Sequence, residues 1–178
     1  MPSLVLALLL AILASSACAP LPTPAVPDRG TYESSAGFSI QYPTSWQRLD
    51  TGEYPIVFAT QAAPGTTLLE KRMEIDVRDL GLDCRQTTYG GALVSETLTS
   101  LQTDGGSFLV ETGTGIAAGN IYEWTSYSTT RGFNCVTITF VLHSADPGVY
   151  ATAPSPFDKA AESAIFNELL GTYRPRAY

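Results

Sequence analysis

Few residues of this sequence combine the types and the spacing that catalysis requires. His143, the one histidine in 178 residues, ends an alternating segment and could act as a general base or a metal ligand. No second histidine accompanies it, and the serines are scattered without a nearby base or a GxSxG sequence. The sequence therefore predicts a protein that is not an enzyme and holds no cofactor, with His143 as a satisfied or solvated side chain.

An acidic run offers the oxygen ligands that calcium prefers. It consists of Glu70, Glu74, Asp76, Asp79 and Asp83. Arginines alternate with these carboxylates, and the segment lacks the DxDxDG spacing of a calcium-binding loop. We therefore expect a solvated strand face here, with no metal site.

The segment Gly113–Asn120 (GTGIAAGN) has the glycine content of a phosphate-binding loop. However, a strand-like segment follows it where a phosphate loop requires a helix N-terminus, and the segment contains no lysine. The sequence predicts a flexible hairpin connection instead.

Three aromatic residues, Tyr122, Trp124 and Tyr127, lie close together in the sequence. Such rings either fill a core or form a surface on which a ligand stacks. We expect core packing with one exposed ring, and a ligand-stacking surface is the alternative.

Cys84 and Cys135 are the two cysteines outside the N-terminal region. In an oxidising compartment, two such cysteines in one domain favour a disulfide. A redox pair or a metal site is the alternative, but the two residues are far apart, without CxxC spacing or a histidine cluster nearby.

The N-terminal segment predicts export. The apolar run Leu4–Ala14 has about 11 residues, whereas a membrane-spanning helix needs about 20. It fits the hydrophobic region of a signal peptide, predicted here as residues 1–17. Ser16, Ala17 and Cys18 then resemble the lipobox of bacterial lipoproteins, which implies a lipid on Cys18 and attachment to the cell membrane or outer membrane. Cleavage after Ala19 would instead give a secreted protein, and an uncleaved anchor is a third possibility.

Residues 18–30 predict a spacer. This stretch contains four prolines from Ala19 onward and few residues that could pack in a core. The remaining residues, 31–178, have the composition of one globular domain that can bury its own core.

The charge balance excludes two classes of partner. The formal net charge is −7, from 17 acidic and 10 basic residues. Nucleic acids and anionic lipid surfaces both require a basic footprint. Any membrane attachment must therefore come from the lipid.

The residue patterns in 31–178 predict mainly strands. Alternating or β-branched patterns predict them at Phe38–Pro43, Pro55–Thr60, Lys71–Leu80, Phe108–Glu111, Ile121–Thr129 and Cys135–His143. Leu93–Leu101 is ambiguous between an edge strand and a helix, and Thr103–Gly106 has turn chemistry. Both faces of Cys135–His143 are uncharged, which favours a place near the middle of the sheet.

One helix is expected near the C-terminus. Ser155 is the predicted N-cap, followed by Pro156 at the first helical position and Asp158 at the third. Gly171 is predicted to end the helix in a left-handed conformation. An apolar stripe through Phe157 and Leu169 should pack against the sheet, which gives an α+β fold of a mainly antiparallel sheet with packed helices.

The segment FSIQYPTSW, the strand pair that includes Trp124, and the closing FDKAAESAIFNELLGTYR resemble bacterial lipoproteins with a PsbP-like domain. The resemblance implies an α/β/α sandwich and a generally non-catalytic role. In that superfamily, plant PsbP proteins are accessory subunits of photosystem II, and a nuclear-transport relative binds the GTPase Ran. This chain has one histidine and a proline-rich spacer at the place of the plant N-terminal segment, so the photosystem role does not transfer.

Two functions are compatible with these residues. The first is a membrane-tethered binding or accessory protein of the cell envelope that contacts an unknown protein partner through the loop His143–Pro154, with Val149 and Tyr150 as contact residues. The alternative is a small-ligand carrier with an apolar pocket between sheet and helix. An envelope hydrolase is disfavoured because the sequence offers no placed nucleophile and base.

Overall fold

The computed structural model describes residues 28–49, 54–62, 64–79, 84–85 and 92–176. These residues form ten strands, one α-helix and one short 3-10 helix. The elements are β1 (Arg29–Ser34), β2 (Phe38–Pro43), β3 (Gln47–Leu49), β4 (Ile56–Gln61), β5 (Leu68–Asp79), β6 (Ala92–Thr103), β7 (Gly106–Ala117), β8 (Asn120–Arg131), β9 (Asn134–Ala145), η1 (Pro147–Val149), α1 (Lys159–Leu170) and β10 (Arg174–Pro175).

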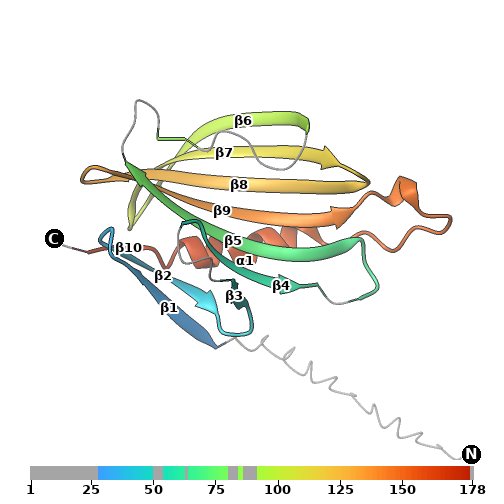
Figure 1. The fold of residues 1–178 in the computed structure, drawn as a ribbon, viewed down its shortest axis with the longest axis horizontal. Coiled ribbons are helices and arrows are strands. Elements are labelled where there is room, and N and C mark those ends of the chain that lie inside the picture. Colours follow the sequence, from blue (N-terminus) through green and yellow to red (C-terminus); the bar gives the residue numbers. More distant parts are fainter. Residues whose placement is uncertain (1–27, 50–53, 63, 80–83, 86–91, 177–178) are drawn as a thin grey trace, which may run out of the picture.

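A seven-stranded antiparallel sheet dominates the molecule. Its strand order is β3-β4-β5-β9-β8-β7-β6, and β5 to β9 each have 12 residues (Figure 1). A smaller sheet of order β1-β2-β10 packs beside it. Since β9 is the fourth strand of seven, the predicted central position of Cys135–His143 is confirmed. The ambiguous segment 93–101 belongs to the edge strand β6.

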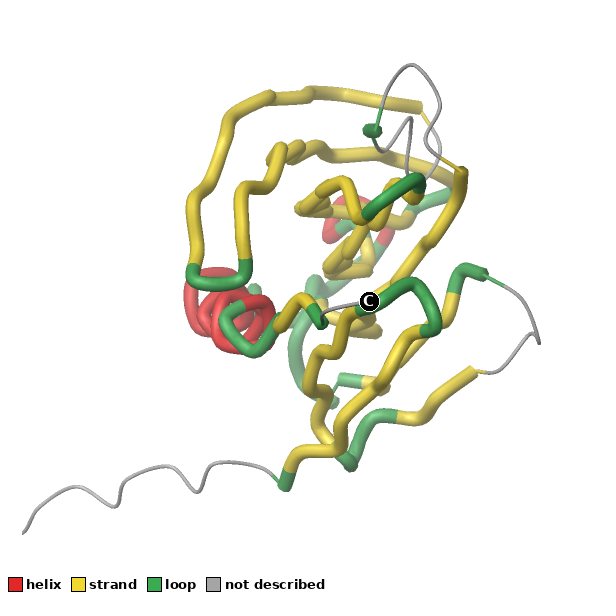
Figure 2. The backbone as a smooth tube through the Cα atoms, turned by 90° about the vertical axis from the view of Figure 1, so that its left-hand side faces the viewer, coloured by secondary structure: helices red, strands yellow, loops and turns green. Residues whose placement is uncertain are grey.

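The hydrophobic core lies between the large sheet and α1. On β9 the alternation of side chains directs Val136, Ile138 and Phe140 to the α1 side, and all three are buried. Phe140 stacks on Phe166 of α1 with ring centroids 4.7 Å apart. Viewed along the strands, the sheet is strongly curved and the helix lies against one side of it (Figure 2).

The small sheet closes one end of this core. Tyr173, just before β10, is buried between Phe38 of β2 and Phe108 of β7, with ring centroids at 5.4 and 5.2 Å. β1 begins at Arg29, two residues before the predicted start of the domain, and Arg29 forms an ion pair with Glu168 of α1 (2.8 Å).

The face of the sheet opposite α1 has a buried polar layer. Thr139 Oγ1 donates to Ser126 Oγ at 3.0 Å across β8 and β9, and both side chains are at most 2% exposed. The Glu111 carboxylate of β7 is fully buried and pairs with Arg85, whose Nη2 lies 2.9 Å from Glu111 Oε1. The neighbouring Cys84 forms a disulfide with Cys135 of β9, with Cα atoms 5.3 Å apart.

The structure contradicts the predicted α+β class with packed helices and the α/β/α sandwich that the resemblance implied. Among the described residues, α1 is the one α-helix, and the fold is β-rich. The polar layer explains the difference. Serine, threonine and glutamate side chains there bond to one another or to Arg85, so the face lacks the continuous apolar stripe that a second helix layer would bury.

Three local predictions also need correction. The N-cap of α1 is Asp158, whose carboxylate accepts from the Ala161 amide at 3.0 Å, and not Ser155. Gly171 ends the helix with φ −59°, in the right-handed region. The predicted connection Gly113–Asn120 is mostly strand, because β7 continues to Ala117 and the turn is formed by Ala118 and Gly119 alone, with φ of 49° and 76°.

Loss of the disulfide should lower stability substantially. Cys84 and Cys135 are separated by 51 residues, and a cross-link over this loop is worth about 4 kcal/mol in the loop-entropy model. The double variant Cys84→Ser, Cys135→Ser should therefore unfold at a much lower urea concentration than the oxidised protein. The reduced wild-type protein is the control and should match the variant. Equal urea midpoints for oxidised protein and variant would contradict the prediction.

Candidate binding surfaces

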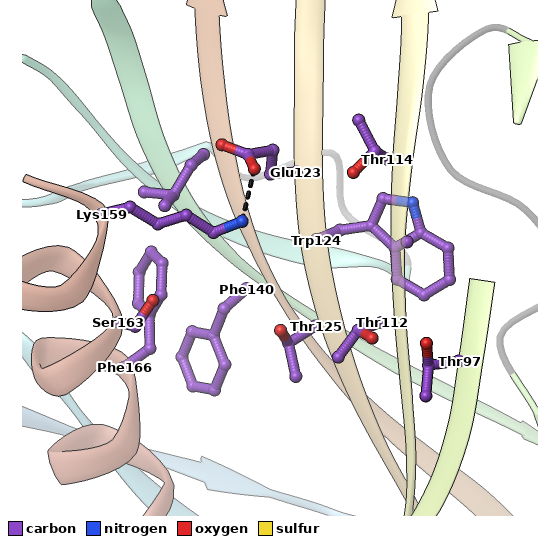
Figure 3. A pocket seen from close by; sticks show the side chains of 12 residues that line it. Thr97, Thr112, Thr114, Glu123, Trp124, Thr125, Phe140, Lys159, Ser163 and Phe166 are labelled. Atoms are coloured by element: carbon purple, nitrogen blue, oxygen red, sulfur yellow. Dashed lines mark hydrogen bonds and ion pairs between the residues drawn. The ribbon is translucent and has the colours of Figure 1, made fainter. Parts of the chain in front are cut away.

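A groove lies between α1 and the strands β6, β7, β8 and β9 (Figure 3). Its volume is about 330 Å³, at the lower end of the range for small-molecule sites. The residues that line it are Thr97, Thr112, Gly113, Thr114, Glu123, Trp124, Thr125, Phe140, Leu142, Lys159, Ser163 and Phe166. The place predicted for a ligand-carrier pocket, between sheet and helix, therefore contains a groove, but hydroxyl and charged groups form much of its wall.

A row of three threonines crosses the groove. The strand register pairs Thr97 of β6 with Thr112 of β7, and Thr112 with Thr125 of β8. Directly paired residues lie on the same face, so the three side chains share the α1 side of the sheet. Figure 3 shows them in line, with Thr97 farthest from the helix. Sequence patterns could not reveal this row, because it depends on the pairing of three strands.

The hydroxyl groups of the groove have no protein partner in the part of the chain that the structure describes. Within the described part of the chain, Thr97, Thr112, Thr114, Thr125 and Ser163 take part in no hydrogen bond. These oxygens are also not among the buried polar atoms that lack a partner. They therefore face the open space of the groove. They are available to donate to and accept from a bound molecule.

An ion pair joins the two sides of the groove. Lys159, in the first turn of α1, binds the carboxylate of Glu123 on β8 (Figure 3). Ser163 lies one helical turn further along α1, on the same side as Lys159. The apolar end of the groove is formed by Leu142 and by the stacked pair Phe140 and Phe166.

The aromatic set of the sequence is divided between the two faces of the sheet. Tyr127 is buried in the core, where burial raises its pKa, whereas alternation places Trp124 on the opposite face. Trp124 is 3% exposed and pairs across the strands with Gly113, and its Nε1 has no hydrogen-bond partner among the described residues. The three rings thus form no common stacking surface, and the expectation of core packing fits two of them.

An apolar patch lies at one end of the large sheet. We use this name for three exposed residues at that end: Ile116 near the end of β7, Val149 of η1 and the following Tyr150, which are 42%, 61% and 43% exposed. The Val149 side chain lies beside Gly119 in the β7–β8 turn, three residues after Ile116. The Asp146 amide donates to the Gly119 carbonyl at 2.9 Å, and the Asp146 carboxylate accepts from the Gly148 amide at 2.8 Å. These bonds hold η1 against the β7–β8 turn. Sequence analysis identified Val149 and Tyr150 but missed Ile116, which is 33 residues away in the chain.

His143 has partners that suit a structural residue. Its Nε2 lies 2.8 Å from Asn120 Oδ1, to which it donates, and its ring stacks on Tyr122 with centroids 4.6 Å apart. Glu70 faces it from β5. Among the described residues, no serine, cysteine or carboxylate is hydrogen-bonded to its ring.

A second polar cluster lies beside the small sheet. Tyr54 Oη lies 3.4 Å from the hydroxyl of Tyr32 and 3.0 Å from Ser34 Oγ. Burial and the hydrogen bond to Tyr54 raise the pKa of Tyr32 to about 12. Tyr32 therefore holds its proton at physiological pH.

The described residues contain no group of three or more acidic, histidine or cysteine side chains that could hold a metal ion. The predicted acidic run is instead divided among ion pairs. Glu70 and Glu74 flank Arg72, at 2.8 and 3.4 Å, and Asp76 lies 3.9 Å from Arg78.

Asp83 lies outside the described residues, as does the predicted lipidation site Cys18 with the signal peptide and most of the spacer. In the described part of the chain, no helix is long and apolar enough to cross a membrane.

The pKa of His143 should lie below its ordinary value of 6.5, because burial disfavours the charged ring. The folded-state pKa is then below that of the unfolded chain. The stability contributed by the neutral ring is fully present above pH 6.5 and is lost as the pH falls through the folded-state pKa. Since this is the one histidine of the chain, its imidazole proton signals can be followed by NMR without ambiguity.

The neighbouring charges give a further check on this pKa. Glu70 favours the charged ring and Arg72 opposes it, so Glu70→Gln should move the NMR midpoint lower still. A wild-type midpoint above 6.5, or an upward shift in Glu70→Gln, would show that the environment of the ring differs from the one described.

No family model matches the sequence, and no curated protein is significantly similar to it. The function must therefore be inferred from the chemistry of the groove and of the apolar patch.

Proposed function

We propose that this chain is a non-catalytic binding or accessory protein of the bacterial cell envelope, tethered by a lipid on Cys18, that contacts a protein partner through its apolar patch. The patch of Ile116, Val149 and Tyr150 is the observation that supports this proposal most directly. Exposed apolar side chains gathered at one end of a fold are typical of contact surfaces, in which aromatic residues often contribute most of the binding energy.

The fixed geometry of the patch adds support. The hydrogen bonds of Asp146 to Gly119 and Gly148 hold η1 in place before any partner binds. A surface that is ordered in advance loses less conformational entropy on association. The patch is therefore better suited to binding than the same side chains on an unrestrained loop.

The envelope location rests on the N-terminal sequence and on the cysteines. A short apolar leader that ends at Ser16-Ala17-Cys18 fits a lipoprotein signal, and a disulfide between Cys84 and Cys135 fits an oxidising compartment.

Site-specific crosslinking tests the partner-binding proposal. A photo-crosslinking amino acid in place of Tyr150 should give one discrete adduct in intact cells, and Val149→Ala should weaken that adduct. The same amino acid in place of Phe133, which is 89% exposed on the β8–β9 hairpin, is the matched control and should not give it. Absence of an adduct at position 150, or the same adduct from both positions, would contradict the proposal.

A second candidate function is the carriage of a small ligand, which the groove beside α1 favours. A carrier purified gently from its own host should retain its ligand. Native mass spectrometry should then show a stoichiometric mass increase that disappears on denaturation. A mass equal to that of the processed chain alone would contradict this function.

A further inference from the structure

We propose that the groove between α1 and strands β6 to β9 binds a mono- or disaccharide. This inference rests on the second proposed function, ligand binding in the groove, and gives the chemical class of the ligand. It depends on three features of the groove: its hydroxyl wall, its internal charge neutrality and its apolar end.

The hydroxyl wall matches the chemistry of a sugar. Each threonine hydroxyl can donate one hydrogen bond and accept others, as can each sugar hydroxyl. Thr97, Thr112 and Thr125 lie on adjacent strands, which are about 4.8 Å apart, and none of the three has a protein partner within the described residues. A sugar ring can therefore bridge neighbouring threonines, with its hydroxyls donating hydrogen bonds to some threonine hydroxyls and accepting them from others.

The same wall argues against a purely apolar ligand. A hydrocarbon chain in the groove would displace water from these hydroxyls without replacing its hydrogen bonds. Each polar group left unsatisfied in this way weakens the binding of such a ligand. Five such groups, Thr97, Thr112, Thr114, Thr125 and Ser163, would oppose the binding of a lipid tail.

The charges of the groove favour a neutral ligand. Lys159 and Glu123 neutralise each other across the groove, so neither an anion nor a cation finds an uncompensated opposite charge there. The Glu123 carboxylate has further acceptor positions beyond its bond to Lys159, and hydrogen bonds to a carboxylate are stronger than neutral ones. A sugar hydroxyl next to Thr114, which pairs with Glu123 in the register, can donate to that carboxylate.

The apolar end and the size complete the match. Leu142 and the stacked Phe140 and Phe166 form the end next to α1, where the C–H face of a pyranose ring can pack. The volume of about 330 Å³ suits one or two rings. Thr97 is exposed at the other end of the row, so a second ring can extend toward the edge strand β6.

An NMR titration of the folded domain tests this inference. Maltose, cellobiose and N,N′-diacetylchitobiose are added separately to ¹⁵N-labelled protein, and octanoate serves as an apolar probe. We expect saturable shifts of the amides of Thr112, Thr125 and Ser163 with at least one disaccharide in the millimolar range.

A matched pair of variants links the binding to the hydroxyls. The double variant Thr112→Val, Thr125→Val keeps the β-branched shape that a strand favours but removes two hydroxyls, and it should weaken binding about tenfold or more. Thr130 lies on the same strand as Thr125 but faces away from the groove. The control variant Thr130→Val should therefore bind like the wild type. Unfolding curves of both variants establish that each remains folded.

The outcomes separate this inference from the function on which it rests. Binding of octanoate in the groove without binding of any disaccharide would overturn the saccharide inference and leave ligand carriage standing. Absence of saturable shifts with all four probes would overturn both. Unchanged disaccharide affinity in the double valine variant would also overturn the saccharide inference, since the hydroxyl row would then not be the site.

Discussion

The packing of Phe166 on Phe140 is the contact on which the rest of the structure depends. It fixes α1 against the middle of the large sheet, where the two rings stack 4.7 Å apart. Two ion pairs then hold the helix on either side of this contact, Lys159 to Glu123 on β8 and Lys71 on β5 to Glu162 at 2.9 Å. The core, the small sheet and the groove all take their shape from the position of the helix. Surface ion pairs contribute little on their own, so burial of the aromatic pair supplies most of the energy.

Most individual elements could be predicted from sequence, because alternation of apolar residues directly reports a strand with two unlike faces. β2, β4, β8 and β9 lie close to the predicted ranges. The start of α1 was misplaced because both Ser155 and Asp158 are good N-caps, and only the structure shows that Asp158 makes the capping bond. The glycines of β7 suggested a loop, although Gly113 pairs with Trp124 within the sheet.

The prediction of the fold class was wrong for a physical reason. The residue patterns predicted an α+β fold with a helix packed on a mainly antiparallel sheet, and only the resemblance implied helices on both faces. Sequence gives no direct measure of what covers the second face. There, buried hydroxyls, Glu111 and Arg85 satisfy one another, an arrangement that depends on strand register. The two candidate sites also differ in how far the sequence alone can predict them. Val149 and Tyr150 stand out in a proline-punctuated loop, whereas the threonine row exists only through the pairing of β6, β7 and β8, and a slip of one residue would turn it to the other face.

The adjacent residues Cys84 and Arg85 connect to two strands that are not neighbours. Cys84 is bonded to β9 and Arg85 to Glu111 of β7, and β8 lies between those strands in the sheet. The segment thus forms a strap over β8. Local fraying of β8 would require its two neighbours to separate, which the strap resists. Backbone amides of β8 should therefore exchange with solvent deuterium only when the whole domain opens, and the three strands behave as one cooperative unit.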